Sequence, residues 1–187
     1  MRPFKSTIPI EEARELLRTG VSPVVFTEIL PLAQAAGRVA ATDIAASIFV
    51  PPFSRSAMDG YAVRCADVLA AGTRLPVSQR IPAGSVGVHL APGTAARIFT
   101  GAPVPAGADA VVMQELCSLD GDGVVIDHVP RPGEWIRRAG EDIDRGQTIL
   151  AAGERLTPPH LGLAASLGCA RLPVFRRLRV ALFSTGD

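Results

Sequence analysis

The sequence is poor in cysteine, in aromatic residues and above all in lysine. Its three cysteines, Cys65, Cys117 and Cys169, are widely spaced and form no CxxC pair. An odd, scattered set argues against a disulfide framework and against a zinc site, and it fits a reducing cytosol. We expect each cysteine to be a small buried apolar side chain. Lys5 is the only lysine among 19 basic residues; the arginine bias suits oxyanion binding, although genome composition explains most of it more simply.

Strong net charge and long apolar runs are also absent. The formal charge is +1 in 187 residues, so electrostatics give no reason to expect a nucleic-acid or membrane partner. No stretch reaches the ~18 apolar residues of a membrane span, and the N-terminus lacks the apolar run of a signal peptide. With 48% hydrophobic residues the chain can bury a core. We therefore predict a soluble, cytoplasmic protein.

No familiar catalytic motif is present. The sequence contains no GxSxG elbow, no GxxxxGK[ST] loop and no GxGxxG loop. The three histidines, His89, His128 and His160, are isolated and lack the spacing of a metal site.

Helical patterns occur near both ends. Residues 9–19 predict a helix with Glu11 and Glu12 in its first turn and an apolar face that should pack on a neighbour. We predict a shorter helix over 30–36 and an extended segment over 38–48. Thr157 followed by proline predicts the start of a helix that ends at Gly168.

Between these helices the pattern changes to short apolar runs separated by Gly and Pro. From about residue 49 to 140 it predicts a compact all-β domain, with a hairpin turn at 119–123. Residues 141–156 predict two short strands around Gly146 and Gly153. Near the end, 171–175 predicts a further strand, and 179–183 predicts a strand buried in a parallel sheet. Because the helix that should follow such a strand is missing, the chain resembles a fragment, although a natural edge strand would end the same way.

The segment 51–64, PPFSRSAMDGYAVR, is the strongest candidate for a site loop. Two prolines keep it out of a central strand or a helix interior, and Asp59-Gly60 is a turn pair. Loops that hold charged side chains at fixed positions often carry function. An ordinary polar turn between two strands is the alternative.

Two more polar loops complete the candidates. Residues 99–109 follow an apolar strand and contain a rigid Gly-Ala-Pro-x-Pro run, which would fix Thr100. Residues 135–142 carry Arg137 and Arg138 next to Glu141 and Asp142. Paired arginines suit an anion, and the acidic pair could bind a hard cation such as Mg²⁺. From the residues alone we predict a polar site built from Asp59, Thr100 and the Arg137 loop.

Four segments together resemble the molybdopterin molybdotransferase family, which includes MoeA and the E domain of gephyrin and its plant counterpart. They are PPFSRSAMDGYAVR at 51–64, RIFTGAPVPAGADAVVMQE at 97–115, IRRAGEDI at 136–143 and RVALFSTGD at 179–187. Four long motifs in one order make a specific resemblance, which covers this chain but only the N-terminal part of the family. It implies insertion of molybdate into adenylated molybdopterin with release of AMP, assisted by magnesium.

The resemblance also implies roles for individual residues. The implied catalytic residues are Asp59, Thr100, Arg137 and Asp142. The implied substrate- or anion-binding residues are Ser56, Arg138, Ser184 and Thr185. The implied metal ligands are Asp59, Glu141 and Asp187. An aspartate beside anionic molybdate and phosphate makes electrostatic sense when a divalent cation lies between them.

The implied fold is mixed α+β and rich in β-structure. We expect an N-terminal helical segment (1–26), a discontinuous linking domain (27–46 and 147–177), an inserted all-β domain (47–146) and the first strand of a truncated α/β domain (178–187). The family implies a homodimer with a shared active site, so this chain alone should be inactive. The adenylyltransferase that supplies adenylated molybdopterin is a further implied partner. The alternative function is a non-catalytic dimerisation or scaffold module of the gephyrin type.

Overall fold

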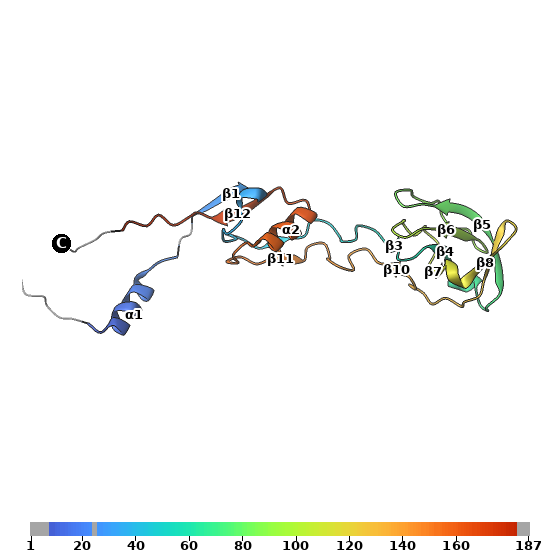
Figure 1. Ribbon diagram of the computed structural model, residues 1–187, viewed down its shortest axis with the longest axis horizontal. Helices are drawn as coiled ribbons and strands as arrows, with labels where there is room; N and C mark the ends of the chain where they lie inside the picture. The colour runs from blue at the N-terminus through green and yellow to red at the C-terminus, as the bar shows by residue number, and fades with distance from the viewer. Residues whose placement is uncertain (1–7, 24–25, 183–187) are drawn as a thin grey trace, which may run out of the picture. The chain divides into compact units, whose positions relative to one another are not determined.

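The computed structural model describes residues 8–23 and 26–182, which form two compact units (Figure 1). One combines the chain up to Ile44 with the chain from Thr148 onward, and we call it the outer unit. The other, Ala45–Gln147, is the inserted unit. The described residues form a β-rich fold with two α-helices, which confirms the predicted mixed α+β class.

Helix α1 (Ile10–Gly20) confirms the first predicted helix within one residue at each end. Glu11 and Glu12 occupy its first turn, where the positive end of the helix dipole favours them. None of its residues is buried, and the exposed apolar side chains include Ile10, Leu16 and Leu17. The apolar face that the pattern predicted therefore does not pack on a described neighbour.

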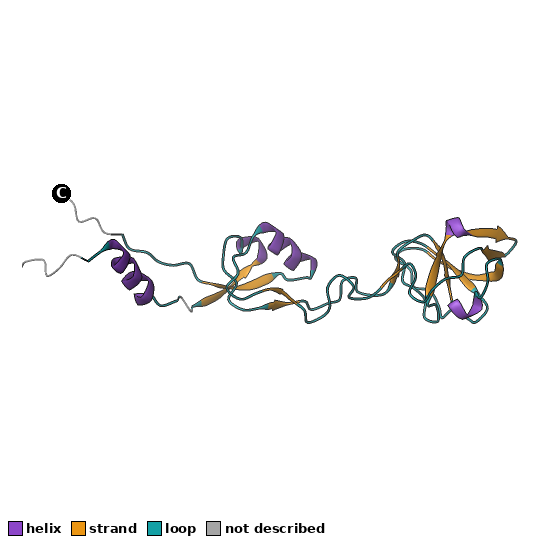
Figure 2. Cartoon of the chain, turned by 90° about the horizontal axis from the view of Figure 1, so that it is seen from below, coloured by secondary structure: helices purple, strands orange, loops and turns teal. Residues whose placement is uncertain are grey.

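The outer unit is built on a two-stranded antiparallel sheet. Strand β1 (Thr27–Pro31) pairs with β12 (Arg171–Phe175), so segments far apart in the sequence lie side by side, in blue and red in Figure 1. Helix α2 (Pro158–Ser166), purple in Figure 2, packs on β11 (Thr148–Leu150), and its Ala164 belongs to the same apolar cluster as Leu172 and Val174 of β12. Thr157 caps α2 in a reciprocal arrangement with His160, and Gly168 follows its end with φ of 80°. The helix predicted to start at Thr157-Pro158 and to end at Gly168 is thus confirmed at both ends.

Three predictions for this part of the chain are wrong. A helix over 30–36 does not form, because Leu30 and Pro31 belong to β1 and only the short 3₁₀ turn η1 (Leu32–Gln34) follows. The segment 38–48 contains one two-residue strand, β2 (Ile44–Ala45), which pairs with β11 (Thr148–Leu150). The second strand expected near Gly153 is reduced to an isolated bridge of Arg155 with Val39.

The parallel strand predicted for 179–183 is also wrong over the described residues 179–182. These residues have no strand conformation, and Val180 and Leu182 are 73% and 91% exposed. A parallel strand needs a neighbour for its backbone hydrogen bonds, and no described strand lies beside this segment. Phe183 lies outside the described residues.

The inserted unit contains a six-stranded sheet of order β7-β4-β6-β5-β9-β8. Its strands are β4 (Gly60–Val63), β5 (Thr73–Ile81), β6 (Ala95–Ile98), β7 (Ala110–Met113), β8 (Cys117–Asp120) and β9 (Gly123–Ile126). Only β5 and β6 run parallel. Strands β8 and β9 form the hairpin predicted at 119–123, with Gly121 at φ of 58°. The 3₁₀ turns η2 (Cys65–Asp67) and η3 (Gln114–Leu116) lie between strands that are consecutive in the sequence but not adjacent in the sheet, β4 and β5 for η2 and β7 and β8 for η3.

Both faces of this sheet carry buried apolar side chains, because side chains alternate along each strand. Along β4, Tyr61 and Val63 belong to one apolar cluster and Ala62 to the other. The core uses mainly Ala, Val, Leu and Ile, as the low aromatic content predicts. The cysteines are half-buried rather than fully buried.

A second small sheet in the inserted unit pairs β3 (Arg55–Ser56) with β10 (Ile136–Arg137). It draws together two of the three polar loops singled out in the sequence. Among the described residues, no helix is both long enough and apolar enough to cross a membrane.

Candidate functional site

Asp59 and Thr100, which are 41 positions apart, are joined by two hydrogen bonds. One carboxylate oxygen of Asp59, Oδ1, accepts the backbone N–H of Thr100 at 2.8 Å and its hydroxyl at 2.7 Å. The turn at 99–102 makes this possible because Gly101 has φ of 84°. No described residue donates to the second oxygen of Asp59, so that oxygen remains available to solvent or a ligand.

These hydrogen bonds favour the ionised form of Asp59. The Thr100 backbone N–H, then its hydroxyl, hold the pKa of the Asp59 carboxyl below its ordinary value, and the charge of Arg97 adds a smaller effect in the same direction. Asp59 is therefore an anion at neutral pH in this structure. A carboxylate kept ionised can bind a cation or accept a proton.

Backbone hydrogen bonds fasten the loop that carries Asp59 to the Thr100 loop. The Ser56 N–H donates to Ala102, and the Gly101 N–H donates to Ser56, both at 2.9 Å. Ser56 itself is buried, and its hydroxyl donates to the Met58 carbonyl at 2.5 Å. As placed, Ser56 shapes the loop from inside rather than presenting its hydroxyl to solvent.

Arg97 of strand β6 helps to hold the Asp59 loop in place through hydrogen bonds to its neighbours. It donates to the Gly60 carbonyl at 3.0 Å and to Gln114 Oε1 at 2.6 Å. The Gln114 backbone N–H in turn donates to the carbonyl of Asp59 at 3.0 Å. Neither Arg97 nor Gln114 was predicted as a site residue. Only the register of β4, β6 and β7 brings them to Asp59, and no local sequence signal could have revealed that register.

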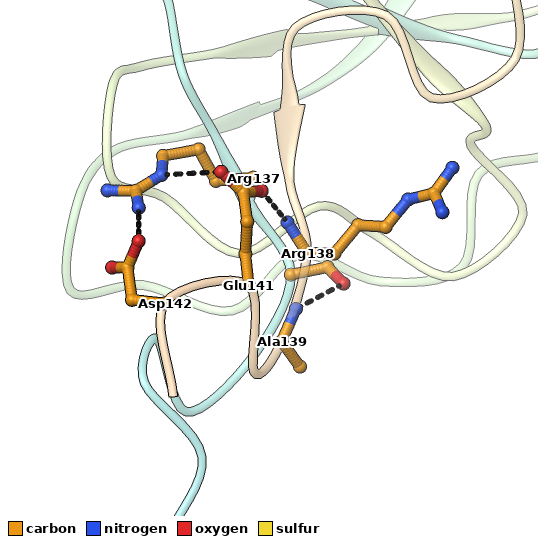
Figure 3. A network of polar contacts seen from close by, with 6 residues as sticks. Arg137, Arg138, Ala139, Glu141 and Asp142 are labelled. Carbon is orange, nitrogen blue, oxygen red and sulfur yellow. Dashed lines mark hydrogen bonds and ion pairs between the residues drawn. The ribbon is translucent and has the colours of Figure 1, made fainter. Parts of the chain in front are cut away.

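The loop 135–142 forms a separate ion-pair network (Figure 3). Arg137 donates to Asp142 Oδ1 at 2.5 Å and to Glu141 Oε1 at 3.4 Å. The other Glu141 oxygen accepts the Arg138 backbone N–H at 2.9 Å. Asp142, then Glu141, raise the pKa of Arg137. The arginine is already neutralised by its own loop.

Arg138 extends away from Arg137 and its carboxylates (Figure 3). Its guanidinium makes no ion pair with a described carboxylate within 4.0 Å. Arg138 lines a cavity of about 490 Å³ together with Ser54 and Asp109. The two adjacent arginines therefore differ: one is neutralised and the other is free to meet an anion.

The structure thus groups the predicted site residues into two sets, both in the inserted unit. Asp59 and Thr100 form one set, and Arg137, Glu141 and Asp142 form the other. Strand β3 connects their loops, since Ser56 pairs with Ile136, but no hydrogen bond or ion pair within the described chain joins the two sets. Ser56 and Arg138 belong to neither set, and the other predicted residues, Ser184, Thr185 and Asp187, lie outside the described residues.

The described residues do not form a complete cation site. No group of three His, Cys, Asp or Glu side chains in the described ranges could hold a metal ion. Asp59 offers one free oxygen, whereas Glu141 is engaged by Arg137 and Arg138. The predicted ligand set of Asp59, Glu141 and Asp187 is therefore not assembled by this part of the chain.

Comparison with protein families places these loops in context. A family model described as the MoeA N-terminal region (domain I and II) matches residues 8–168. Molybdopterin molybdenumtransferase 2 of Mycobacterium tuberculosis is 49% identical over 163 residues, which are 84% of this chain and 40% of that protein. Molybdopterin molybdenumtransferase of Haemophilus influenzae is 42% identical over 182 residues, which are 96% of this chain and 45% of that protein.

Solved structures show the same fold. The crystal structure of the molybdopterin biosynthesis moeA protein from Pyrococcus horikoshii OT3 superposes with a TM-score of 0.81 at 36% identity, covering 90% of this chain and 46% of that one. A second structure of a Pyrococcus moeA protein gives a TM-score of 0.83 at 34% identity, covering 92% of this chain and 45% of that one. The chain spans less than half the length of each of these proteins.

Proposed function

This chain belongs to the MoeA family, whose N-terminal region it matches, and we propose that it contributes part of the active site of a molybdopterin molybdotransferase. The proposed reaction inserts molybdate into adenylated molybdopterin and releases AMP during molybdenum cofactor biosynthesis. The names of the relatives at 49% and 42% identity support this reaction class. A cytoplasmic location stays a prediction.

The observation that carries the proposal is the carboxylate of Asp59, fixed by the backbone and side chain of Thr100. Two donors on one oxygen fix the orientation of the carboxylate before substrate arrives, which removes part of the entropic cost of positioning it. The free oxygen can then accept a proton or hydrogen bond, or share a cation with the substrate.

The charges of the proposed substrates explain why such a carboxylate needs a positive charge nearby. Molybdate and the phosphates of adenylated molybdopterin are anions, so they repel an ionised Asp59 unless positive charge lies nearby. We propose magnesium for that role, with its other ligands supplied by residues beyond the described chain, by substrate or by water. Arg138, which has no carboxylate partner among the described residues, is the proposed anion-binding residue of the loop 135–142, and Asp142 and Glu141 hold Arg137 in place.

A chimera tests this proposal. The matching N-terminal region of the Haemophilus influenzae relative would be replaced by this chain, and AMP release would be measured with molybdate and adenylated molybdopterin. We expect the chimera to turn over, Asp59→Asn to lose activity by at least about 100-fold, as for removal of one electrostatic group from an active site, and residues 1–187 alone to be inactive. Asp127→Asn, which changes an exposed carboxylate of the same unit, should leave the rate unchanged.

Each alternative gives a distinct result. Turnover by residues 1–187 alone would contradict the proposal that the site is shared with another part of the enzyme. A folded Asp59→Asn chimera with the normal rate would remove Asp59 from the site. A non-catalytic scaffold would tolerate loss of both Asp59 and Thr100.

We also propose that the protein acts as a homodimer. Support comes from α1, whose exposed apolar side chains Ile10, Leu16 and Leu17 would be stabilised by burial against another surface. Analytical ultracentrifugation of the chimera and of its Leu16→Glu, Leu17→Glu variant measures this directly, and a monomeric chimera would overturn it. The adenylyltransferase stays a predicted partner.

A further inference from the structure

Two arginines stand side by side on one face of the sheet in the inserted unit. Arg80 of β5 is the register partner of Arg97 of β6, and Tyr61 of β4 is the partner of Arg97 on its other side. Directly opposed residues on neighbouring strands point to the same face. Tyr61, Arg97 and Arg80 therefore form a row across three strands.

Arg80 reaches this face because β5 contains a β-bulge. Val77 pairs with Ala95 and Arg80 pairs with Arg97, so three steps along β5 match two steps along β6. In a regular strand Val77 and Arg80 would face opposite sides. The extra residue turns Arg80 to the side of Val77, and both line the same cavity. Bulges commonly redirect a side chain next to a binding site.

Within ion-pair distance, the described chain offers this pair no counter-charge, although the more distant Asp59 carboxylate interacts weakly with Arg97. Both guanidinium carbons lie 4.6 Å from the centre of the Phe99 ring. Arg97 donates to two uncharged oxygens, those of Gly60 and the Gln114 side chain. Neither arginine forms an ion pair within 4.0 Å with a described carboxylate. Like charges on directly opposed strand positions repel one another, and ring stacking offsets only part of that cost.

A cavity of about 340 Å³ opens beside the pair. Tyr61, Val77 and the exposed Leu119 line it together with Arg80 and Arg97. The one carboxylate in the lining, Asp122, already pairs with Arg74 at 2.9 Å. A second cavity of about 330 Å³ shares Tyr61, Arg97 and Leu119 with the first. The two cavities together are lined by both arginines and by the apolar or aromatic side chains of Tyr61, Val77 and Leu119.

We propose that Arg80 and Arg97 bind the phosphate group of a small phosphate monoester, whose organic part rests against Tyr61 and Leu119. Planar guanidinium groups bind phosphate oxygens through paired, charge-assisted hydrogen bonds. Bound phosphate would supply the missing negative charge between the two arginines. This site is distinct from the Arg137 loop, and it does not depend on the proposed reaction.

Nuclear magnetic resonance titrations of the purified chain test this site. Inorganic phosphate, AMP and adenosine would be added separately at low ionic strength, and backbone amide shifts followed. We expect saturable changes near Arg80, Arg97 and Leu119 with phosphate and with AMP, tighter binding of AMP, and little change with adenosine. Arg80→Gln should weaken the binding of AMP about tenfold, the value of one charge-assisted hydrogen bond.

Arg145→Gln is the matched control, because it removes the same charge from an exposed position of the same unit. If both variants weakened AMP binding equally, the effect would come from net charge alone and the site would be overturned. Shifts that do not saturate, or equal binding of adenosine and AMP, would overturn it as well. Leu119→Asp, at a 77% exposed position in the cavity wall, provides a second test if Arg80→Gln does not fold. It should abolish AMP binding by repulsion, and unchanged binding would reject the proposal.

Discussion

Thr100 determines how firmly Asp59 keeps its negative charge. Its backbone N–H and hydroxyl both donate to Oδ1, and the two bonds are the largest causes of the lowered pKa of Asp59. Thr100→Val keeps the side-chain shape and the backbone donor but removes the hydroxyl. We expect the pKa of Asp59 to rise in this variant, although not to its full unfolded value. Carbon-detected magnetic resonance of the carboxyl group over a pH titration measures the change.

The same change alters how stability responds to acid. Because the folded-state pKa of Asp59 is lowered, its contribution to stability is present above the unfolded pKa, near 4, and is lost as pH falls through the folded value. Wild-type protein should therefore lose more stability below about pH 4 than Thr100→Val does. Thr94→Val is the control, since the Thr94 hydroxyl donates to a backbone carbonyl rather than to a carboxylate. Equal acid sensitivity of wild type and Thr100→Val would contradict the linkage.

Individual residues also show where sequence reasoning reached its limit at the site. The turn pair Asp59-Gly60 and the rigid loop at Thr100 indicated that both side chains are held in place, and the structure joins them directly. Arg80, Arg97 and Gln114 gave no such signal, because their neighbours come from other strands and from a bulge that shifts β5 by one residue. Residue type alone also could not separate Arg137, which its own loop neutralises, from Arg138, which extends away from that network.

At the scale of elements, two glycines differ in the space that their surroundings leave for a side chain. A Cβ on Gly60, the first residue of β4, would lie 1.9 Å from the Val112 carbonyl oxygen of the neighbouring strand, whereas one on Gly162 in α2 would meet nothing within 4 Å. We expect Gly60→Ala to destabilise the inserted unit by about 3 kcal/mol or more through overpacking. Gly162→Ala should stabilise α2 by about 0.5–1 kcal/mol. Urea unfolding of both variants checks this pair, and similar effects of the two substitutions would contradict it.

Helix α1 and strand β12 differ in how deeply their leucine side chains are buried, and so in how much these side chains stabilise the fold. Leu172 of β12 is 1% exposed, whereas Leu16 of α1 is 57% exposed. Leu172→Ala should cost about 2–5 kcal/mol because it leaves a cavity, and Leu16→Ala should change stability by less than about 0.5 kcal/mol. Calorimetric unfolding at protein concentrations at which sedimentation shows the chain to be monomeric gives both values. A large loss in Leu16→Ala would show that α1 packs on a surface that the structure does not contain.

Periodicity predicted elements well where a segment's own residues decide its conformation. The capped start of α2, the acidic first turn of α1 and the Gly-Asp-Gly hairpin of β8 and β9 are all local signals, and all three were confirmed. The helix predicted over 30–36 was wrong because its first residues belong to a strand, 27–31, that pairs with 171–175, at least 140 positions away. Tertiary pairing overrides local preference in such segments. Residues 179–182 failed for the opposite reason, since the sheet that a buried strand needs is not among the described strands.

At the scale of the whole molecule, the two units have separate cores. The inserted unit, Ala45–Gln147, contains its own two apolar clusters, and the cluster of the outer unit draws on residues from both sides of it in the sequence. We expect residues 45–147 alone to fold and to keep the amide shifts that they have in the full chain. An unfolded spectrum, or shifts that differ throughout its sheet, would show that its stability depends on the outer unit.

The two ends of the inserted unit are fastened to one another. The Ala46 N–H donates to Gln147 at 2.9 Å, and the Gly146 N–H donates back to Ala46 at 2.8 Å. Because the two ends of the unit already contact one another, inserting the unit into another chain costs little loop-closure entropy. Domain insertion is tolerated at junctions of this kind. The unit can therefore be treated as a cassette. It could be grafted into a surface hairpin of an unrelated host protein, carrying Asp59, Thr100 and the arginine pair with it, while the outer unit could be closed by a short glycine-rich turn.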